Sequence, residues 1–248
     1  MLVNYSTFYD DKYWTGRKTY QSLDGATHLY HGPGLAWEGF QLCVDALAPL
    51  VPGKSALDIG CGGGDLVQRL IPKGFDAYGV DVSEHAVKNC SPEMKYRLAL
   101  TDITTCPEHL YPANTPEPAG PFPNKFDLIL ATDLLEHIFI EDLDRTFDWM
   151  VSKSNRWLFF CVAVTDSYKS EFVHKKGEPV PIQHQATAVS GHVNVRFWGW
   201  WGQYFRARKD ITIRWDLMYI FQLTREKHKD WKATPGWDMG TTFVLEKK

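Results

Sequence analysis

A short apolar run that breaks into glycine marks the first third of this chain. Residues 56–64 read ALDIGCGGG, a stretch with the composition of a buried strand that ends in Gly60, Gly62, Gly63 and Gly64. A tight turn needs only one glycine, because glycine adopts a positive φ without steric cost. Four glycines leave a whole loop almost without side chains. We therefore expect the backbone of this loop to approach a bulky ligand closely, just beyond the end of a strand.

Strand-like and helix-like segments alternate around this loop. Apolar residues at helical spacing predict helices at residues 35–50, 66–71, 84–89 and 140–151, and apolar runs predict strands at residues 55–59, 77–82, 96–100, 126–131 and 157–164. This alternation indicates an α/β fold with a doubly wound, mostly parallel sheet and helices on both faces. Two strand-like runs, 211–221 and 241–245, are expected to form an antiparallel terminal pair, which makes the sheet seven-stranded.

The remaining segments are interpreted as additions to one domain. Residues 1–34 precede the first predicted helix and are interpreted as an N-terminal lid on a domain that spans residues 35–248. Six prolines in residues 104–125 exclude a regular element, so this segment is interpreted as a surface insertion. Residues 165–196 are polar and follow the last parallel strand. Because ligands bind at the carboxyl ends of such strands, we predict a substrate loop there.

Composition restricts the classes of function. The formal net charge of −3 lacks the positive surplus that is typical of nucleic-acid-binding proteins. The five cysteines form no C-x-x-C pair, which argues against a zinc knuckle or a disulfide framework and favours a reducing, cytoplasmic setting. No stretch is apolar over the roughly 18 residues that a membrane span requires. The N-terminus also lacks the pattern of a signal peptide.

The residues around the glycine loop argue against a phosphorylated ligand. A Walker loop ends in G-K-[ST], whereas Gly64 is followed by Asp65 and Leu66. The dinucleotide pattern G-x-G-x-x-G also fails, because it would need a glycine at Asp65. Asp58 stands directly before the loop, and its negative charge would repel a pyrophosphate. We therefore expect a ligand that carries positive charge near Asp58.

The D-x-G-x-G-x-G pattern of Asp58, Gly60, Gly62 and Gly64 resembles motif I of the class I S-adenosylmethionine-dependent methyltransferases. The resemblance spans roughly residues 35–164, with the glycine motif its most specific part. It implies a Rossmann-like fold and S-adenosylmethionine (SAM) as cofactor, whose sulfonium is cationic and suits an acidic loop. Cys61 lies inside the motif, where a small residue is sufficient. We expect Cys61 to line the cofactor without a chemical role.

The same resemblance implies cofactor contacts at the ends of the next strands. Asp81, with Val82 beside it, ends the strand about 20 residues after the glycine loop, where a carboxylate accepts hydrogen bonds from both ribose hydroxyls. Asp102 and Ile103 end the third strand, where the family has an acid that faces the adenine amine.

Two further segments resemble cofactor-lining parts of the family. The sequence FDLILATDLLEHI resembles the fourth strand and the turn that follows it, so Asp133 is expected to line the cofactor. The N-terminal sequence FYDDKYWTGRKTY, with Tyr9, Tyr13 and Trp14, resembles the lid that covers the cofactor in many relatives. Tyr13 is therefore predicted as a cofactor contact.

Methyl transfer to a hydroxyl requires an aligned acceptor and a base. The turn ATDLLEH contains neither the [DNS]-P-P-[YF] nor the Pro-Cys motif of DNA-base methyltransferases. His192 resembles the histidine that precedes a late helix in many small-molecule and sugar methyltransferases, and we predict it as the base for a small-molecule or glycan hydroxyl. His137 is the second catalytic candidate. The alternative for His192 is a purely structural cap on the helix that begins near Phe197.

Asp133, Glu136 and His137 form a D-x-x-E-H pattern. It resembles the E-x-x-E-H set that holds a divalent ion in ubiquinone-pathway O-methyltransferases and, with a later histidine, in small-RNA 2′-O-methyltransferases. His192 would be that later ligand. However, L-E-H is also common at this turn in relatives without a metal, and Asp133 replaces the expected glutamate. We therefore predict no metal, and a magnesium or manganese site stays open as the alternative.

Three other functions stay open. A non-catalytic SAM-binding subunit would keep the glycine loop without transferring a methyl group, and an NAD-dependent oxidoreductase would bind nicotinamide instead. An RNA 2′-O-methyltransferase would need basic side chains for phosphate, and the sequence offers Lys175, Lys176, Arg196, Arg206, Arg208 and Lys209. The aromatic segment FWGWWGQYF at residues 197–205 is interpreted either as a core helix or as an acceptor pocket.

Overall fold

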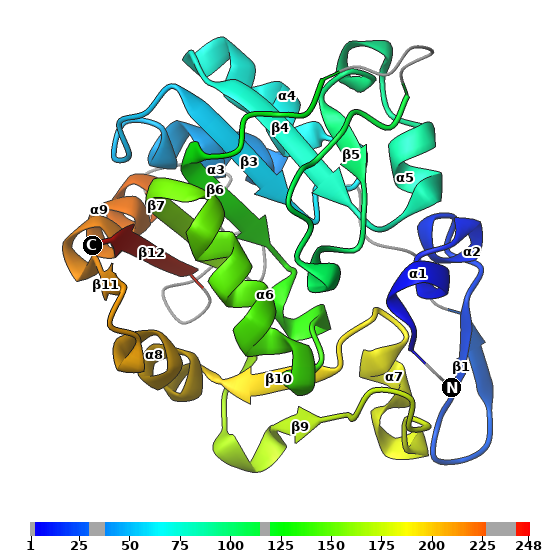
Figure 1. Cartoon of the computed structure of the whole chain (residues 1–248). Coiled ribbons are helices and arrows are strands. Elements are labelled where there is room, and N and C mark those ends of the chain that lie inside the picture. The colour runs from blue at the N-terminus through cyan, green and yellow to red at the C-terminus, as the bar shows by residue number, and fades with distance from the viewer. Residues whose placement is uncertain (1–2, 30–37, 115–119, 227–241) are drawn as a thin grey trace.

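The computed structural model describes residues 3–29, 38–114, 120–226 and 242–248. Its largest element is a seven-stranded sheet with the strand order β11-β12-β7-β6-β3-β4-β5 (Figure 1). Its strands are β3 (Ser55–Ile59), β4 (Asp76–Asp81), β5 (Leu98–Leu100), β6 (Phe126–Thr132), β7 (Ser154–Cys161), β11 (Ile211–Ile213) and β12 (Thr242–Lys247). The five strands from β3 to β7 pair in parallel, and β12 pairs antiparallel with both β7 and β11. The predicted fold class is confirmed.

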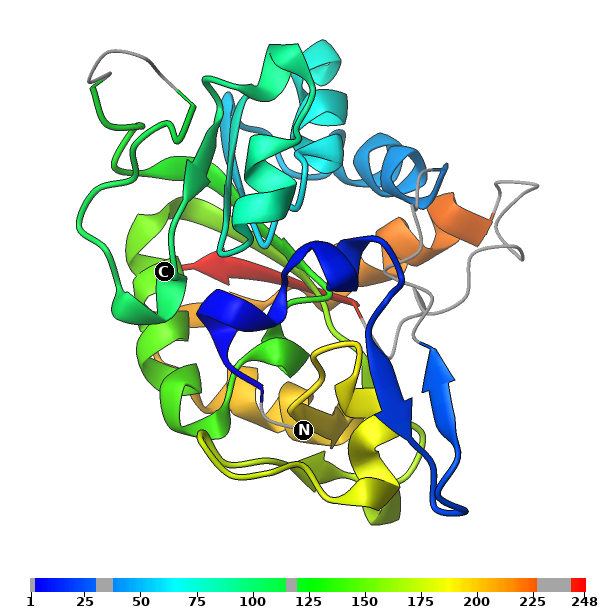
Figure 2. The same ribbon diagram turned by 90° about the vertical axis from the view of Figure 1, so that its right-hand side faces the viewer.

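Helices cover both faces of this sheet (Figures 1 and 2). They are α3 (Glu38–Leu47), α4 (Asp65–Leu70), α5 (Glu84–Lys88), α6 (Ile140–Lys153), α8 (Trp198–Ala207) and α9 (Trp215–Glu226). Helix α3 packs against both α4 and α9, while α6 packs on β6 and β7 from the other face. Short 3-10 turns are Ile71–Lys73, Pro92–Met94, Ile103–Thr105, Leu135–His137, Tyr168–Ser170 and Ile182–His184.

The core is built from the apolar runs of the strands and from the apolar faces of the helices. In the central strands, side chains on both faces are buried, as for Leu57, Leu130 and Phe159, none of which is exposed. On α6, Leu143 and Phe147 lie one turn apart and face the sheet. Each fully buried side chain of this size stabilises the fold by about 1.5–3 kcal/mol. The core therefore fixes the carboxyl ends of β3, β4 and β6, from which the site is built.

A smaller layer lies beyond those carboxyl ends. Strands β8 (Val164–Thr165), β9 (Phe172–Val173) and β10 (Asn194–Phe197) form a three-stranded sheet in the order β8-β10-β9, and α7 (Gln185–Ala188) lies beside it. The predicted loop at residues 165–196 thus contains short regular elements. Helices α1 (Tyr5–Phe8) and α2 (Asp11–Trp14) pack against this layer, and the hairpin β1 (Thr19–Gln21) and β2 (Thr27–Leu29) follows them (Figure 2).

Several predicted bounds need correction. The run 211–221 is not one strand, because β11 ends at Ile213 and the next residues form helix α9. Strand β5 begins at Leu98 rather than at residue 96, and β7 ends at Cys161 rather than at residue 164. The boundary predicted at residue 34 lies outside the described residues, as does the middle of the proline-rich insertion. Among the described residues, no helix has the length and apolar character that a membrane crossing requires.

Candidate active site

The glycine loop turns sharply at the carboxyl end of β3. Gly60, Gly62 and Gly64 have φ angles of 79°, 54° and 89°, a region that other residues rarely adopt. The amide groups of Gly60 and Cys61 donate to the carbonyl oxygen of Val80 at 2.8 and 3.2 Å, which ties the loop to β4. A Cβ atom on Gly62 would lie 3.2 Å from the Trp14 ring. Positive φ angles at Gly60, Gly62 and Gly64, and the Trp14 ring beside Gly62, therefore disfavour side chains at three of the four glycines, whereas a Cβ at Gly63 would meet nothing within 4 Å.

Asp81 holds the glycine loop against the end of β4. One carboxylate oxygen accepts from the Gly62 amide at 2.8 Å, and the other accepts from the Ser83 amide at 2.7 Å. Burial raises the pKa of this carboxyl, and the backbone hydrogen bonds lower it. Each oxygen keeps a second lone pair for a further donor, such as a ribose hydroxyl.

Asp58 is the acid that most clearly lacks a partner. It is 3% exposed, and its Oδ1 accepts no hydrogen bond from any described residue. Burial, together with the nearby charge of Asp81, raises the pKa of Asp58 to about 8. A buried carboxylate is costly unless a positive group compensates it. The site at the end of β3 therefore fits a cationic cofactor.

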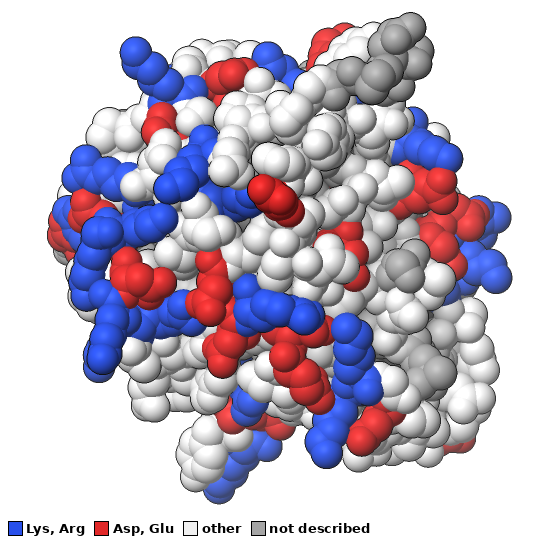
Figure 3. All heavy atoms as spheres, viewed as in Figure 1, with Lys and Arg blue, Asp and Glu red and all other residues white. Residues whose placement is uncertain are grey.

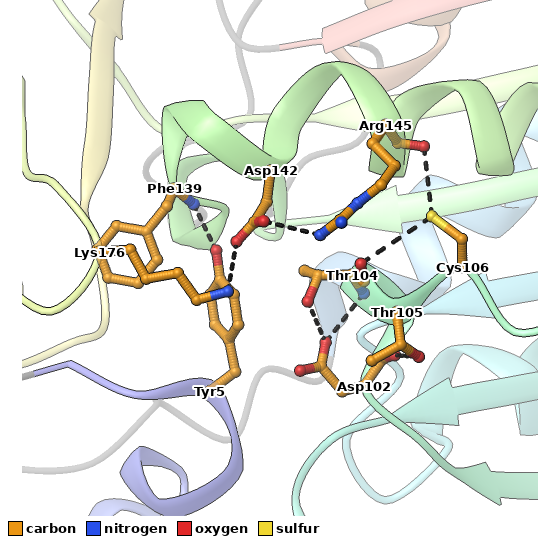
Figure 4. Close-up of polar contacts among 9 residues, drawn as sticks. All are labelled: Tyr5, Asp102, Thr104, Thr105, Cys106, Phe139, Asp142, Arg145 and Lys176. Carbon is orange, nitrogen blue, oxygen red and sulfur yellow. Dashed lines mark hydrogen bonds and ion pairs between the residues drawn. The ribbon is translucent and has the colours of Figure 1, made fainter.

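The other predicted cofactor residues lie at neighbouring strand ends. Asp102 caps a 3-10 turn, because its Oδ1 accepts from the amide and the hydroxyl of Thr104 at 2.9 and 2.7 Å (Figure 4). Ile103 is buried beside it. Asp133 is exposed after β6 and has a φ of 51°, with its amide bonded to the Cys161 carbonyl oxygen at 2.8 Å. These three residues follow β5 and β6, as the sequence indicates.

The two candidate histidines meet across a long sequence separation. The rings of His137 and His192 lie with centroids 4.7 Å apart at an interplanar angle of 84°. The Val193 amide donates to the Glu136 carbonyl oxygen at 2.9 Å, which pins the start of β10 to the turn after β6. The structure thus brings both catalytic candidates together at the carboxyl end of the sheet.

Glu136 joins these histidines. Glu136, His137 and His192 each offer one ligand atom. These three atoms lie within 4.8 Å of one another, as the ligands of a metal ion would. The Glu136 Oε1 accepts from the Ala163 amide at 2.9 Å, and its Oε2 has no partner among the described residues. One carboxylate and two imidazoles suit a divalent transition metal better than magnesium. The donor set therefore fits a cation, although Asp133 is not part of it.

Burial sets the charge of this cluster. It lowers the pKa of His192 to about 4, and it lowers the pKa of His137 well below its usual value, with His192 adding to the effect. Burial and the neighbouring charge of Asp133 raise the pKa of Glu136. At neutral pH both imidazoles are therefore uncharged and have a lone pair available, for a proton or for a metal.

The N-terminal residues 3–14 contact this site. The Trp14 indole donates to the Ser83 hydroxyl at 2.7 Å, and that hydroxyl donates to the Tyr9 carbonyl oxygen at 2.6 Å. The Tyr13 hydroxyl donates to the Ser190 carbonyl oxygen at 3.2 Å. Sequence reasoning missed Ser83, whose only signal is its position as the N-cap of α5. It also missed Gly191, which lies directly before His192.

The aromatic segment forms α8 and is mostly core. Trp201 and Phe205 are buried, and the Phe205 ring contacts the rings of Phe147, Phe160 and Phe243. These contacts favour the core-helix interpretation over an acceptor pocket formed by the whole segment.

Three of the six predicted phosphate-binding cations form ion pairs, namely Lys176, Arg196 and Arg208. Lys176 and Arg145 both bond to Asp142, which is buried at the start of α6 (Figure 4). Arg208 forms ion pairs with Asp148 and Asp210. Figure 3 shows Lys and Arg interspersed with Asp and Glu over one face of the molecule. Charges of both signs therefore partly offset one another on this face.

A bare glycine turn, a buried acid whose Oδ1 has no partner among the described residues, and a second acid at the next strand end lie together, the arrangement expected of a SAM-dependent methyltransferase. Residues 38–208 match the family described as a methyltransferase domain. The chain therefore belongs to this family, whose cofactor is SAM. The family match and the fold agree with the class that the glycine motif indicates.

Curated relatives of this chain are methyltransferases, and a solved structure shares its fold. A ubiquinone biosynthesis O-methyltransferase of Thiobacillus denitrificans is 34% identical over 95 residues, which are 38% of this chain and 38% of that protein. One of Bordetella parapertussis is 24% identical over 60% of this chain and 55% of its own length. The plantazolicin methyltransferase BpumL bound to SAH matches with a TM-score of 0.53 at 16% identity, over 85% and 83% of the two chains. This structural likeness shows the fold alone.

Proposed function

We propose that this chain transfers the methyl group of SAM to a hydroxyl of a small molecule or glycan. The buried, unpartnered Asp58 beside the glycine loop is the observation that supports cofactor binding most directly. In the reaction, a bond forms between the acceptor oxygen and the methyl carbon while the carbon–sulfur bond breaks, and the hydroxyl proton passes to a base. The named O-methyltransferase relatives act in ubiquinone biosynthesis, which supports a small-molecule acceptor for this chain.

His192 is the proposed base. It lies just before β10 and beside His137 at the carboxyl end of the sheet. Its pKa of about 4 keeps the imidazole unprotonated at neutral pH, so its lone pair is available. The same low pKa makes it a weak proton acceptor, because burial disfavours the imidazolium. Alignment of the acceptor therefore supplies most of the proposed catalysis.

The cluster of Glu136, His137 and His192 supports a second, metal-assisted candidate. These residues would hold a divalent cation, which supplies Lewis-acid polarisation of the acceptor hydroxyl. The unpartnered Glu136 Oε2 and the two uncharged imidazoles are the observations that support this version. A cation held there would use the His192 lone pair, so His192 would act as a ligand rather than as the base.

Cofactor binding is the first test of the proposed function. Replacing Asp81 with Ala is expected to weaken SAH binding about 10- to 100-fold, since charge-assisted hydrogen bonds contribute about 1.5–3 kcal/mol. Calorimetry on the purified chain measures this affinity. Asp76→Ala is the matched control, because Asp76 lies at the other end of β4, where its exposed carboxylate bonds to Arg97 and to the Tyr78 hydroxyl. Equal affinity of both variants would remove Asp81 from the cofactor site.

The base and metal versions differ in how they respond to metal. Calorimetric titration with Mn²⁺ measures binding without an acceptor, and Glu136→Gln is expected to weaken a metal site about 10-fold or more. If no metal binds and turnover persists in EDTA, His192 acts alone, and His192→Ala should abolish turnover while SAH affinity stays unchanged.

Two other outcomes would favour the alternative functions. Salt-sensitive RNA binding would favour an RNA acceptor. SAH binding without transfer to any hydroxyl would favour a non-catalytic subunit.

A further inference from the structure

One hydroxyl of the N-terminal segment touches the histidine cluster. The Tyr9 hydroxyl lies 2.9 Å from His137 Nδ1, and the two rings are 5.9 Å apart at 60°. His137 is buried and Tyr9 is half-buried. The contact joins residues 128 positions apart, so it forms only when residues 3–14 lie across the carboxyl end of the sheet.

Tyr9 is held in place independently of His137. Its carbonyl oxygen accepts from the Ser83 hydroxyl at 2.6 Å, directly after β4. Its ring contacts those of Phe8 and Tyr13 at centroid distances of 5.2 and 5.0 Å. Asp10 caps the next helix by accepting from the Tyr13 amide at 3.0 Å. The position of the Tyr9 hydroxyl is therefore set by β4 and by its own segment, and His137 must meet it.

Gly191 leaves the space for this contact. Its φ is 95°, and a Cβ atom there would lie 2.5 Å from the Tyr9 hydroxyl oxygen and 2.7 Å from His137 Nδ1. Real Cβ atoms do not approach other atoms so closely. Any side chain at Gly191 would therefore separate Tyr9 from His137. The glycine in the sequence S-G-H before β10 is what allows the contact.

The contact decides which nitrogen of His137 faces the cluster. A neutral imidazole carries one proton, and its position depends on the hydrogen bond that each nitrogen makes. Since Nδ1 lies beside Tyr9 and Gly191, and the Gly191 backbone also hydrogen-bonds to the His137 ring, we assign Nε2 to the side of His192 and Glu136. A hydroxyl that accepts the Nδ1 proton leaves the Nε2 lone pair free.

We propose that Tyr9 is a positioning residue that accepts the Nδ1 proton of His137 and so directs the Nε2 lone pair toward His192 and Glu136. The cluster is then complete only while the N-terminal segment covers the glycine loop, where Trp14 lies against Gly62. This couples the covering of the cofactor to the orientation of the groups that meet the acceptor. The proposal rests on the proposed function for its catalytic consequence, but not for the tautomer itself.

The test is ¹⁵N side-chain NMR of the full chain at one neutral pH, comparing Tyr9→Phe with the parent. In the parent we expect His137 as a single tautomer with its proton on Nδ1, and in Tyr9→Phe a mixture or the other tautomer. Tyr13→Phe is the matched control, because it removes one hydroxyl from the same segment without touching His137. Gly191→Ala should have the same effect as Tyr9→Phe, by steric displacement.

Kinetics separates this role from simple stability. We expect Tyr9→Phe to lower kcat about 10- to 100-fold, as for other residues that orient a functional histidine, with unchanged SAH affinity and unchanged melting temperature. An unaltered His137 tautomer in Tyr9→Phe would overturn the proposal. An altered tautomer together with no transfer to any hydroxyl would support the positioning role and count against the proposed function.

Discussion

The protonation state of the buried Asp58 links both stability and cofactor binding to pH. Its pKa of about 8 lies above the usual value of 3.8, because burial and Asp81 disfavour the carboxylate. In the cofactor-free chain the folded state keeps a proton that the unfolded state loses. The contribution of Asp58 to the free energy of unfolding is therefore full below about pH 4 and declines as the pH rises toward 8. A cationic sulfonium nearby reverses this preference and favours the carboxylate.

We therefore predict that SAM binding releases close to one proton at pH 7. Asp58 is protonated in the free chain at this pH and ionised beside the cofactor, so affinity rises with pH until about 8. Calorimetry in phosphate and in Tris measures the release, since the two buffers differ in ionisation enthalpy. In Asp58→Asn the buffer dependence should vanish. Buffer-independent binding by the parent chain would show that Asp58 does not meet the sulfonium.

Residues of the site differ in how far the sequence predicts them. Asp58, Gly60 and Asp81 are predictable, because a glycine turn and an acid at the next strand end keep a fixed spacing that the fold dictates. The contact of Tyr9 with His137 is not, because it joins distant segments and leaves no spacing to recognise. The proximity of His192 to the turn after β6 is predicted only as part of the alternative metal site, which depends on family resemblance rather than on local pattern.

At the scale of elements, helix α8 contains two glycines in different surroundings. A Cβ atom at Gly202 would meet nothing within 4 Å, whereas one at Gly199 would lie 3.0 Å from the Phe197 ring. We predict that Gly202→Ala raises the free energy of unfolding by about 0.5–1 kcal/mol, the usual gain inside a helix. Gly199→Ala should gain less or lose stability. Urea denaturation of the two variants measures the difference, and equal gains would contradict the close contact at Gly199.

The spacing of apolar residues predicts most of the helices and strands correctly, but it does not predict helix α9. Leu217, Met218 and Phe221 are buried at helical spacing, but Trp215 and Tyr219 on the other side are also apolar and exposed. A helix that is apolar on both sides has no clear period, so the run resembles a strand. The three residues of β11 that precede it strengthen that impression. The short strands β8 and β9 were missed because two residues carry no pattern.

At the scale of the molecule, three segments that are distant in the sequence meet at the carboxyl ends of the parallel strands. Residues 3–14, the glycine loop after β3 and the residues that lead into β10 contact one another through Trp14, Tyr9 and Gly191. The N-terminal segment lies beside the smaller layer in Figures 1 and 2, far from the β11 edge. Among the described residues, the segment contributes four buried side chains to a small cluster of eight. This part of the fold therefore opens at a lower free energy than the central strands.

We predict that SAH slows amide hydrogen exchange in all three segments together. A ligand that binds the closed arrangement stabilises it by mass action, so residues 3–14, 58–64 and 190–193 should each gain protection. Helix α8 and strand β11 serve as internal controls, because they lie outside these contacts and should exchange at unchanged rates. Mass spectrometry of peptides from the full chain measures every segment in one experiment. Protection confined to the glycine loop would mean that the N-terminal segment does not respond to the cofactor, and the coupling through Tyr9 would then have no means of sensing it.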